Sequence, residues 1–586
     1  DNDSMLIRFS NLSRRDFNSI LEKVRKLGNR RYDPTLEGWV VPMTKSNFDE
    51  VDKLAREEGF LIDGAVLDRL DQLLIAESLS SSLYKPQSAN EFSNISDLIG
   101  VLRDYQLVCV EYVSRNPRTI IGDDIGIGKT LEALASVINL NALPCVIITP
   151  ARQLKLNWKH EITKWFGDKY RVMVLNGLEP TITPELVSSD FIIVNYEILA
   201  SGSDPSLGQL PAIKIVRPKS IVCDECHKLK NRSSLRTRAV IELVNQCSPN
   251  VRLLLSGTPL LNRPQELVPL LDILGMLKPL FSSAGKFLID YNWTNKDEVT
   301  GHRARKFSEL NSILRQHCFI RRRKEDVLTE LPSCTVAKQL IDLDNRNEYQ
   351  SVQRDLVNWL IRKVLEDQNY MNSISHLPEP QRRKAIVDAG RNRAATALRA
   401  EQLTRIEFLK QVAVKGKLSG AIEWINNFLE SDEKLVIFAY HNFALERLIN
   451  KFNALHILAK DSEKSRMAAK YDFQTRSDKK LIICSMEVAE LGIDLTAASH
   501  VAILELPWTP SKLDQAIGRV YRQGQAKPVT AWMLLSEGTI EDKILELLSK
   551  KKLVVDAVAD GTYEEDTSGS NSILDDLVKF LSGGTV

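Results

Sequence analysis

The sequence predicts an α/β protein with two parallel-sheet lobes and helical insertions, preceded by a small α+β domain. Two observations indicate this class. Short apolar runs alternate with helical patterns through residues 98–333 and again through residues 416–558, as in parallel sheets covered by helices. The chain has 586 residues, too many for one hydrophobic core, so we expect three or four domains.

The first 75 residues have the pattern of a separate α+β domain. Its expected elements are a strand at 6–9, a helix at 13–27, a strand at 38–42, a helix at 44–58 and a short strand at 59–62. Residues 76–97 are rich in Ser, Asn and Gln, and we expect them to form a linker before the first lobe.

The first lobe, residues 98–333, begins with a glycine-rich loop between a predicted strand and a predicted helix. Glycines let backbone N–H groups approach an anion, and the positive N-terminus of the following helix favours a phosphate. Lys129 would reach the β- and γ-phosphates of ATP, and the Thr130 hydroxyl would bind Mg²⁺. Asp123 stands where the strict pattern G-x-x-x-x-G-K-[ST] has its first glycine, and a plain glycine-rich turn is the alternative.

The predicted ATP site extends beyond this lysine and threonine. Gln106, ahead of the loop, is expected to read the adenine edge with its amide. The complete set is Gln106, Gly122, Asp123, Asp124, Ile125, Gly126, Ile127, Gly128, Lys129 and Thr130, joined by Gly492 and Asp494.

Two acidic residues follow a later apolar strand. Asp224 would hold Mg²⁺, and Glu225 would orient or deprotonate the attacking water. Cys223, Cys226 and His227 also match the haem-attachment pattern C-x-x-C-H, and C-x-x-C is half of a zinc site. Because no second cysteine pair and no signal peptide accompany them, we expect neither haem nor zinc.

A further strand, residues 253–255, ends in small residues that are suited to sensing a nearby phosphate. They are predicted to couple the site to the rest of the molecule together with the histidine of the acidic motif. The predicted coupling residues are His227, Ser256, Gly257 and Thr258.

The second lobe, residues 416–558, contains a pair of arginines on a segment that we expect to be helical. Arg519 and Arg522 are three residues apart and would therefore share one helix face. Such arginines are usually solvated or paired with acids, but in this company they are predicted to act as arginine fingers on the γ-phosphate. The predicted catalytic residues are Lys129, Asp224, Glu225, Gln515, Arg519 and Arg522.

Composition limits the partners only weakly. The formal net charge is +2, so overall charge does not indicate nucleic acid, and local basic clusters would have to provide that contact. No apolar run approaches membrane-spanning length, so we expect a soluble protein with no membrane partner. Residues 334–415 are expected to form a helical insertion between the lobes, and residues 559–586 a flexible tail with a short helix.

This ordered set of motifs resembles the Swi/Snf-type ATPases of helicase superfamily two. The resemblance covers roughly residues 98–558 and includes three blocks typical of that family, at residues 319–332, 522–525 and 538–541. It implies two RecA-like lobes. Two departures are small: Cys226 replaces the usual Ala or Ser, and Asn195 stands where Ser or Thr is commoner.

A second, shorter resemblance lies at residues 28–39, which are similar to the HARP domain of annealing helicases. A cation pair beside a stacking ring suggests contact with DNA, although Tyr32 and Trp39 packing a small module is an equal alternative. The candidate DNA contacts are Arg30, Arg31, Trp39, Arg321, Arg322 and Arg323.

The resemblance implies an ATP hydrolase that uses ATP and Mg²⁺ and translocates on double-stranded DNA, including forked or branched duplexes. It favours an annealing helicase or replication-fork remodeller acting in DNA repair. The alternatives are an ATPase that remodels chromatin or other protein–DNA complexes, and a catalytically inactive DNA-binding scaffold. We expect a cytoplasmic protein in a bacterial or viral context, or a nuclear one if the source is eukaryotic.

Overall fold

The computed structural model describes residues 4–8, 20–21, 23–24, 31–33, 38–42, 45–59, 61–64, 66–67, 95, 97–200, 208–257, 264–295, 298–302, 307–365, 378–379 and 399–560. The chain divides into two compact units, Asp1–Gln87 and Ser88–Val586. The second unit contains both predicted lobes.

The N-terminal unit contains a three-stranded antiparallel sheet in the order β1-β3-β2 and a helix. Its elements are β1 (Ser4–Ile7), β2 (Arg31–Asp33), β3 (Gly38–Pro42) and α2 (Lys45–Glu58). Met5, Val41 and Leu54 pack in its core. The strand expected at residues 59–62 is not formed, because residues 61–63 have no regular structure and the Leu61 side chain is 100% exposed.

The first lobe is built on a seven-stranded parallel sheet in the order β12-β4-β9-β8-β5-β7-β6. Its central strands are buried along their whole length, which explains why they read as unbroken apolar runs. The strands are β4 (Arg118–Ile121), β5 (Cys145–Thr149), β6 (Val172–Val174), β7 (Phe191–Asn195), β8 (Ser220–Cys223), β9 (Val251–Leu255) and β12 (Phe319–Ile320).

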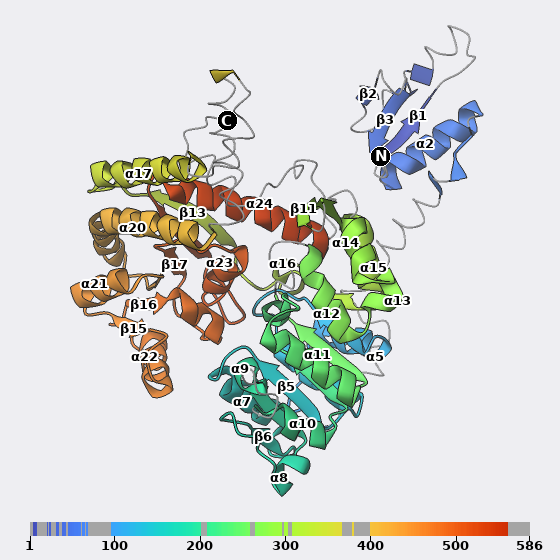
Figure 1. Ribbon diagram of the computed structural model, residues 1–586, viewed down its shortest axis with the longest axis horizontal. Helices are drawn as coiled ribbons and strands as arrows, with labels where there is room; N and C mark the ends of the chain where they lie inside the picture. The colour runs from blue at the N-terminus through green and yellow to red at the C-terminus, as the bar shows by residue number, and fades with distance from the viewer. Residues whose placement is uncertain are drawn as a thin grey trace. The chain divides into compact units, whose positions relative to one another are not determined.

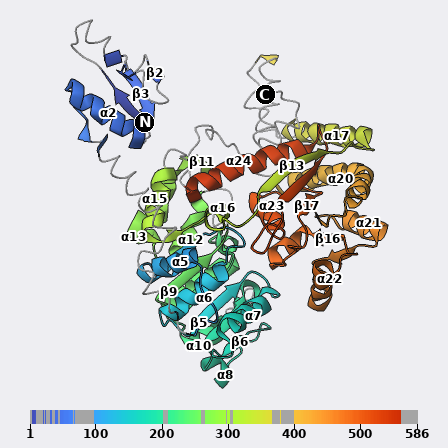
Figure 2. The ribbon, with the colours of Figure 1, turned by 180° about the vertical axis from the view of Figure 1, so that it is seen from behind.

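Helices cover both faces of this sheet, with α11 over one face and α5 and α6 over the other (Figures 1 and 2). The first helix, α5 (Asp104–Arg115), precedes β4. The helices between the strands are α6 (Lys129–Asn139), α7 (Leu154–Phe166), α8 (Pro184–Val187), α9 (Tyr196–Leu199), α10 (Leu210–Val216), η1 (Cys226–Leu229) and α11 (Leu235–Cys247). A mostly helical insertion precedes β12 and consists of η2 (Pro264–Glu266), α12 (Leu267–Leu274), α13 (Leu277–Phe281), α14 (Ala284–Tyr291), β10 (Asn292–Asn295), β11 (Glu298–His302) and α15 (Phe307–His317).

The second lobe is built on a six-stranded parallel sheet in the order β13-β18-β17-β14-β16-β15. The strands are β13 (Cys334–Leu340), β14 (Leu435–Ala439), β15 (Leu455–Ile457), β16 (Leu481–Ser485), β17 (His500–Ile503) and β18 (Val529–Leu535). The helices are α16 (Lys324–Val327), just before this sheet, then α17 (Arg346–Leu365), α20 (Arg399–Leu429), α21 (Asn442–Phe452), α22 (Glu463–Thr475), η4 (Met486–Leu491), α23 (Pro510–Ile517) and α24 (Ile540–Asp560).

The structure differs from two expectations in this lobe. Residues 334–340, assigned to a helical insertion, form β13 at the edge of the second sheet, in parallel register with β18 from Cys334 opposite Val529. The segment from Gln515 to Gln525 is not one helix, because α23 ends at Ile517 and turns follow. The Gln525 side chain holds those turns by donating from Nε2 to Ala498 O at 2.7 Å.

The predicted tail beyond Asp560 lies outside the described residues. Among the helices that are described, none is both long and apolar enough to cross a membrane.

A buried ion pair joins two helices of the second lobe. Lys417 on α20 is paired with Glu541 on α24, and both side chains are fully buried. The Lys417 ammonium also donates to Leu534 O at 2.7 Å, and Glu541 Oε2 accepts from Ser536 N at 3.0 Å. Each charge is thus neutralised by the other and also bonded to one of these fixed backbone groups.

We expect Lys417→Met to lower the free energy of unfolding by about 3–5 kcal/mol, because it leaves the Glu541 charge buried and unpaired. Urea unfolding followed by tryptophan fluorescence measures the change. Lys527→Met is the matched control: it removes an ion pair with Glu433 that is well exposed, and should cost less than about 1 kcal/mol. Equal losses in the two variants would contradict the prediction.

Candidate active site

Three neighbouring strands of the first sheet bring the predicted site residues to one edge. β9 lies between β4 and β8 in the sheet order. The glycine-rich loop follows β4, the acidic pair follows β8, and Ser256 and Gly257 follow β9. Because the carboxyl ends of parallel strands share one edge, residues far apart in the sequence meet there.

The loop has a backbone shape that depends on glycine. Gly126 and Gly128 have φ angles of +88° and +106°, a region that other residues rarely adopt. A Cβ on Gly128 would also lie 2.5 Å from Gln106 Nε2. Gly128 is the cap of α6, so the loop leads its backbone N–H groups into the positive end of that helix. This cradle fits a phosphate group.

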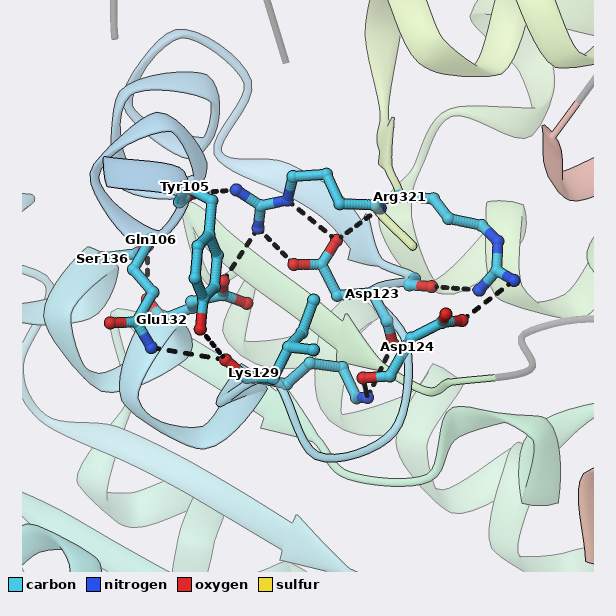
Figure 3. A network of polar contacts seen from close by, with 11 residues as sticks. Tyr105, Gln106, Asp123, Asp124, Lys129, Glu132, Ser136 and Arg321 are labelled. Atoms are coloured by element: carbon cyan, nitrogen blue, oxygen red, sulfur yellow. Dashed lines mark hydrogen bonds and ion pairs between the residues drawn. The ribbon is translucent and has the colours of Figure 1, made fainter. Parts of the chain in front are cut away.

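Lys129 lies folded over the loop. Its ammonium donates to Asp123 O at 2.7 Å and to Asp124 O at 3.0 Å, as Figure 3 shows. The backbone carbonyls thus hold the lysine at the loop, where a phosphate in the cradle would compete for it.

Gln106 and Tyr105 support the loop from α5. Tyr105 Oη donates to Ile127 O at 2.7 Å, and Gln106 Nε2 lies 3.5 Å from the same oxygen (Figure 3). Gln106 Oε1 accepts from Arg103 N at 3.0 Å and thereby caps the start of α5. The adenine-reading role of Gln106 stays a prediction, while its side chain is buried against the loop backbone.

The acidic pair is held in a strained and specific geometry. Glu225 has φ +47° and ψ 55°, a left-handed conformation that is uncommon for a residue with a side chain and is often found at functional sites. Glu225 N donates to Asp224 Oδ1 at 2.9 Å, and Trp158 Nε1 donates to Asp224 Oδ2 at 2.8 Å. The Asp224 carboxylate is therefore held by two donors, one from the next residue and one from α7.

Glu225 is linked to β9 through a histidine and a serine. His227 Nδ1 lies 3.1 Å from Glu225 Oε2 and 3.1 Å from Ser256 Oγ. Ser256 Oγ also donates to Glu225 Oε2 at 3.4 Å. The structure thus brings three of the predicted catalytic and coupling residues into one hydrogen-bonded triangle.

The surroundings separate the two carboxyl pKa values. Burial, together with the negative charge of Glu225, raises the pKa of Asp224 above its usual range. Burial alone would also raise the pKa of Glu225, but the hydrogen bond and charge of His227, with Lys129 and Arg519, lower it instead. Glu225 is therefore ionised at neutral pH and can accept a hydrogen bond from a water molecule.

The donor set fits Mg²⁺ bound together with a nucleotide. Among the described residues, no cluster of three or more His, Cys, Asp and Glu side chains could hold a metal by itself. Mg²⁺ in ATPases normally takes only one or two protein ligands beside waters and phosphate oxygens. Thr130 on the first turn of α6 and Asp224 after β8 would be those ligands. When bound, the ion would neutralise phosphate charge.

The second lobe contributes the arginine-bearing turn to this edge. A Cβ on Gly126 would lie 3.3 Å from Arg522 Cβ, and one on Gly518 would lie 3.2 Å from the Ile125 side chain. Arg522 forms an ion pair with Asp494, and burial together with the charge of Arg522 lowers the pKa of Arg519 to about 10. With that pKa, Arg519 stays charged at neutral pH, and Arg522 lies beside the phosphate loop.

The remaining second-lobe candidates lie around Arg519. Arg519 Nε donates to Gln515 O at 3.2 Å, and a Cβ on Gly492 would lie 3.8 Å from Arg519 Nη1. Gln515 is buried, and its Oε1 has no hydrogen-bond partner within the described part of the chain. An acceptor in that position suits a water molecule or substrate group that arrives with the nucleotide.

Two family models match the two lobes in order. A model of the SNF2-related domain matches residues 105–386, and a model of the helicase conserved C-terminal domain matches residues 420–524. The chain belongs to the SNF2-related family of helicase-like, DNA-dependent ATPases. Its two parallel-sheet lobes and its loop, acidic pair and arginine turn follow the order expected of that family.

Relatives of this SNF2-related ATPase share about a quarter of its residues. A Caenorhabditis elegans homolog of SWI/SNF-related matrix-associated actin-dependent regulator of chromatin subfamily A-like protein 1 is 26% identical over 565 residues, 92% of this chain and 73% of that protein. The Homo sapiens DNA annealing helicase and endonuclease ZRANB3 is 25% identical over 466 residues, 77% of this chain and 40% of that protein. The chain thus spans less than half of the human relative.

Among solved structures, the Sulfolobus solfataricus SWI2/SNF2 ATPase core in complex with dsDNA is similar to this chain. It is 24% identical, and the alignment covers 80% of this chain and 95% of that one with a TM-score of 0.36.

Two predicted DNA contacts of the ATPase are corrected by the structure. Arg322 is fully buried and pairs with Asp123 and Glu132. Arg321 is nearly buried and donates from Nη1 to Gly122 O at 2.7 Å. Both serve the phosphate loop and cannot reach a DNA backbone, because burial gives each guanidinium a protein partner. Arg323 is half-buried, and its proposed contact with DNA stays a prediction.

The other candidate DNA contacts lie in the N-terminal unit. Trp39 on β3 is half-buried and meets Tyr32 edge-on at 5.4 Å, and the Tyr32 side chain is 51% exposed. Arg31 belongs to β2 through its backbone, while Arg30 and the predicted coupling residue Thr258 lie outside the described residues.

Two site residues of the ATPase escaped the sequence analysis. Trp158 on α7 donates to the predicted Mg²⁺ ligand, and Lys324 joins the loop to the second lobe by donating to Tyr521 O at 2.7 Å. Lys324 lies in the family-typical block at residues 319–332, but its partner cannot be read from the sequence, and a tryptophan on a helix usually packs in the core. Their roles come from contacts across the fold.

We expect Glu225→Gln to lower the rate of ATP hydrolysis by about 10²–10⁴-fold, because the amide cannot accept a proton from water. ATP affinity should change little, since the loop glycines and Lys129 remain. Steady-state phosphate release and binding of a fluorescent ATP analogue measure the two quantities. Glu242→Gln, which alters a surface ion pair with Lys214, is the control, and equal rates in the two variants would refute the catalytic assignment.

Trp158→Phe should raise the Mg²⁺ concentration needed for half-maximal ATPase activity by about tenfold, because it keeps the ring but removes the donor that orients Asp224. Trp165→Phe is a matched control on the same helix, since Trp165 Nε1 donates to Glu161 instead. A Mg²⁺ titration of the ATPase rate compares the variants. If both tryptophan variants show the wild-type midpoint, Trp158 does not orient the Mg²⁺ ligand.

Proposed function

We propose that the chain is an ATP-driven translocase of double-stranded DNA, of the annealing-helicase or fork-remodelling type that acts in DNA repair. One observation supports it most directly: the arginine-bearing turn of the second lobe lies against the phosphate loop of the first. Hydrolysis in such a divided site requires both lobes. Each cycle of ATP binding and product release would therefore change how the two lobes contact the bound DNA.

In this proposal each residue has a simple task. Lys129 turns from the loop carbonyls to the β- and γ-phosphates of ATP, and Arg519 and Arg522 neutralise the charge that develops on the γ-phosphate. Glu225 orients and deprotonates the attacking water, while His227 and Ser256 hold that carboxylate in place. The Glu225–Ser256 contact links hydrolysis to β9, at the centre of the catalytic edge.

The name of one relative supports the annealing-helicase assignment, since the human protein described above is named as a DNA annealing helicase and endonuclease. The N-terminal unit offers a matching surface, since the half-exposed Tyr32 ring beside Trp39 can stack on an unpaired base. Forked DNA presents such bases at its junction.

A panel of DNA structures tests the proposal. We expect forked DNA to stimulate ATP hydrolysis more strongly than plain duplex, with little unwinding of a blunt duplex. Tyr32→Ala should remove the fork preference and leave the stimulation by plain duplex, because the ring is exposed and far in sequence from the ATP site. Robust unwinding of the blunt duplex, or equal stimulation by both DNAs in the wild type, would contradict the proposal.

A second candidate is an ATPase that remodels chromatin or other protein–DNA complexes. It is supported by relatives of equal similarity, since the CHD3-type chromatin-remodeling factor PICKLE of Arabidopsis thaliana is 25% identical over 543 residues. The yeast ISWI chromatin-remodeling complex ATPase ISW1 is 26% identical over 480 residues. Stronger stimulation by nucleosomes than by forked DNA would favour this function over fork remodelling.

A further inference from the structure

The segment that joins the two sheets runs beside the phosphate loop before it enters the second lobe. β12 ends at Ile320 in the first sheet, and β13 begins at Cys334 in the second. Gly122 N donates to Ile320 O at 2.7 Å, and Asp124 N donates to Arg322 O at 3.1 Å. The pairing of β12 with β4 therefore continues past the sheet, between the loop and residues 321–324, which we call the loop clasp.

The clasp binds the two acidic side chains of the phosphate loop, those of Asp123 and Asp124. Arg322 N and Nε donate to Asp123 Oδ1 at 2.9 and 3.1 Å, and Arg322 Nη2 donates to Glu132 Oε1 at 2.8 Å. Lys324 N donates to Asp124 Oδ2 at 2.9 Å. Figure 3 shows Asp123 and Asp124, together with Arg321, in one network of polar contacts at the loop.

Arg321 joins the end of β9 to the same network. Its Nη1 donates to Gly122 O at 2.7 Å and to Gly257 O at 3.0 Å, and its Nη2 lies 3.1 Å from Asp124 Oδ1. The clasp is thereby tied both to the start of the phosphate loop and to the end of β9.

The far end of the clasp touches the second lobe. Lys324 Nζ donates to Tyr521 O at 2.7 Å and lies 4.7 Å from the centre of the Tyr521 ring. Tyr521 precedes Arg522, so this contact reaches the backbone that carries the arginine turn. Burial lowers the pKa of Lys324 to about 8, in keeping with an ammonium that is enclosed between the lobes.

Burial makes the clasp and the loop move together. The Arg322 side chain is 0% exposed, and a charge in that position is tolerated only while its partners stay in place. Leu328, beyond the clasp, packs with Tyr105 and Ile127 in one small apolar cluster. If the loop moved without the clasp, the buried charge of Arg322 would lose its partners and the apolar cluster would separate.

We propose that the loop clasp, with Arg322 as its positioning residue, senses the state of the phosphate loop and passes it through Lys324 to the arginine turn. The trigger is Lys129, whose ammonium is held by the carbonyls of Asp123 and Asp124. A phosphate that draws the ammonium away releases these carbonyls, and the side chains of the same two residues are bonded to the clasp. Nucleotide binding thus changes the path between the lobes directly.

The inference rests on the proposed ATP site, and amide hydrogen exchange tests it with the complete chain. A non-hydrolysable ATP analogue with Mg²⁺ is the probe, and its binding is measured separately by fluorescence of a labelled analogue. In the wild type we expect the analogue to change exchange at residues 322–324 and 519–523 by at least about fivefold, because the amides of Arg322 and Lys324 are bonded to loop carboxylates.

Lys324→Met separates sensing from binding. It removes the contact with Tyr521 O but keeps the backbone bond to Asp124, so the analogue should still bind and still change exchange at 322–324. The change at 519–523 should be lost. Arg103→Ala is the control: it removes an exposed ion pair with Glu330 beyond the clasp and should leave both changes intact.

Arg322→Lys keeps the charge and the backbone bond to Asp123 but loses the side-chain contacts of the guanidinium with that carboxylate, and it should weaken the change at 322–324. If this variant does not fold, Lys324→Met still decides the question. The inference is overturned if the wild type binds the analogue without any change at 322–324, or if Lys324→Met keeps the full change at 519–523. Failure of the wild type to bind the analogue would instead overturn the proposed ATP site, and the inference with it.

Discussion

The architecture of the first lobe depends on one fully buried arginine and the acids that neutralise it. Arg322 is enclosed with Asp123 and Glu132, and none of these side chains has access to solvent. Burial and the charge of Asp123 raise the pKa of Glu132 well above its usual range. The charges of Asp123 and Glu132 also raise the pKa of Arg322, against the effect of burial. A neutral cluster of this kind is stable only as a unit, so it fixes where the phosphate loop starts.

This constraint explains an irregularity in the loop motif. Asp123 replaces the first glycine of the strict phosphate-loop pattern, yet its carboxylate points away from the cradle and into the cluster with Arg322. The glycines that shape the cradle, Gly126 and Gly128, are both retained. The loop thus keeps the conformational freedom needed near an anion, while its first position is used for attachment to the segment that leads to the second lobe.

The catalytic edge is assembled from elements of both lobes. β8 and β9 are fully buried strands, and they hold Glu225 and Ser256 within a hydrogen bond of each other. Arg519 and Arg522 come instead from turns after α23 on a separate sheet. A site divided between two sheets is what an SNF2-related ATPase needs if hydrolysis is to depend on the approach of its two lobes.

Much of the fold and the site could be predicted because the signals are local. Buried parallel strands read as apolar runs, and the loop and acidic pair follow such runs directly. β13 was missed because it is an edge strand with alternating exposure, so Cys334 to Leu340 lack an apolar run. The end of α23 was missed because the turns that follow it are held by a contact distant in the sequence, from Gln525 to Ala498.

The sequence alone therefore determined the lobes, the order of the motifs and the chemistry of the ATP site, since each depends on neighbouring residues. Only the tertiary structure decided which partner each charge takes. Asp123 and Arg322 are 199 residues apart, and three adjacent arginines look equally suited to DNA until packing buries two of them. Burial depends on segments that meet through the fold, and it turned these two arginines from expected DNA contacts into supports of the phosphate loop.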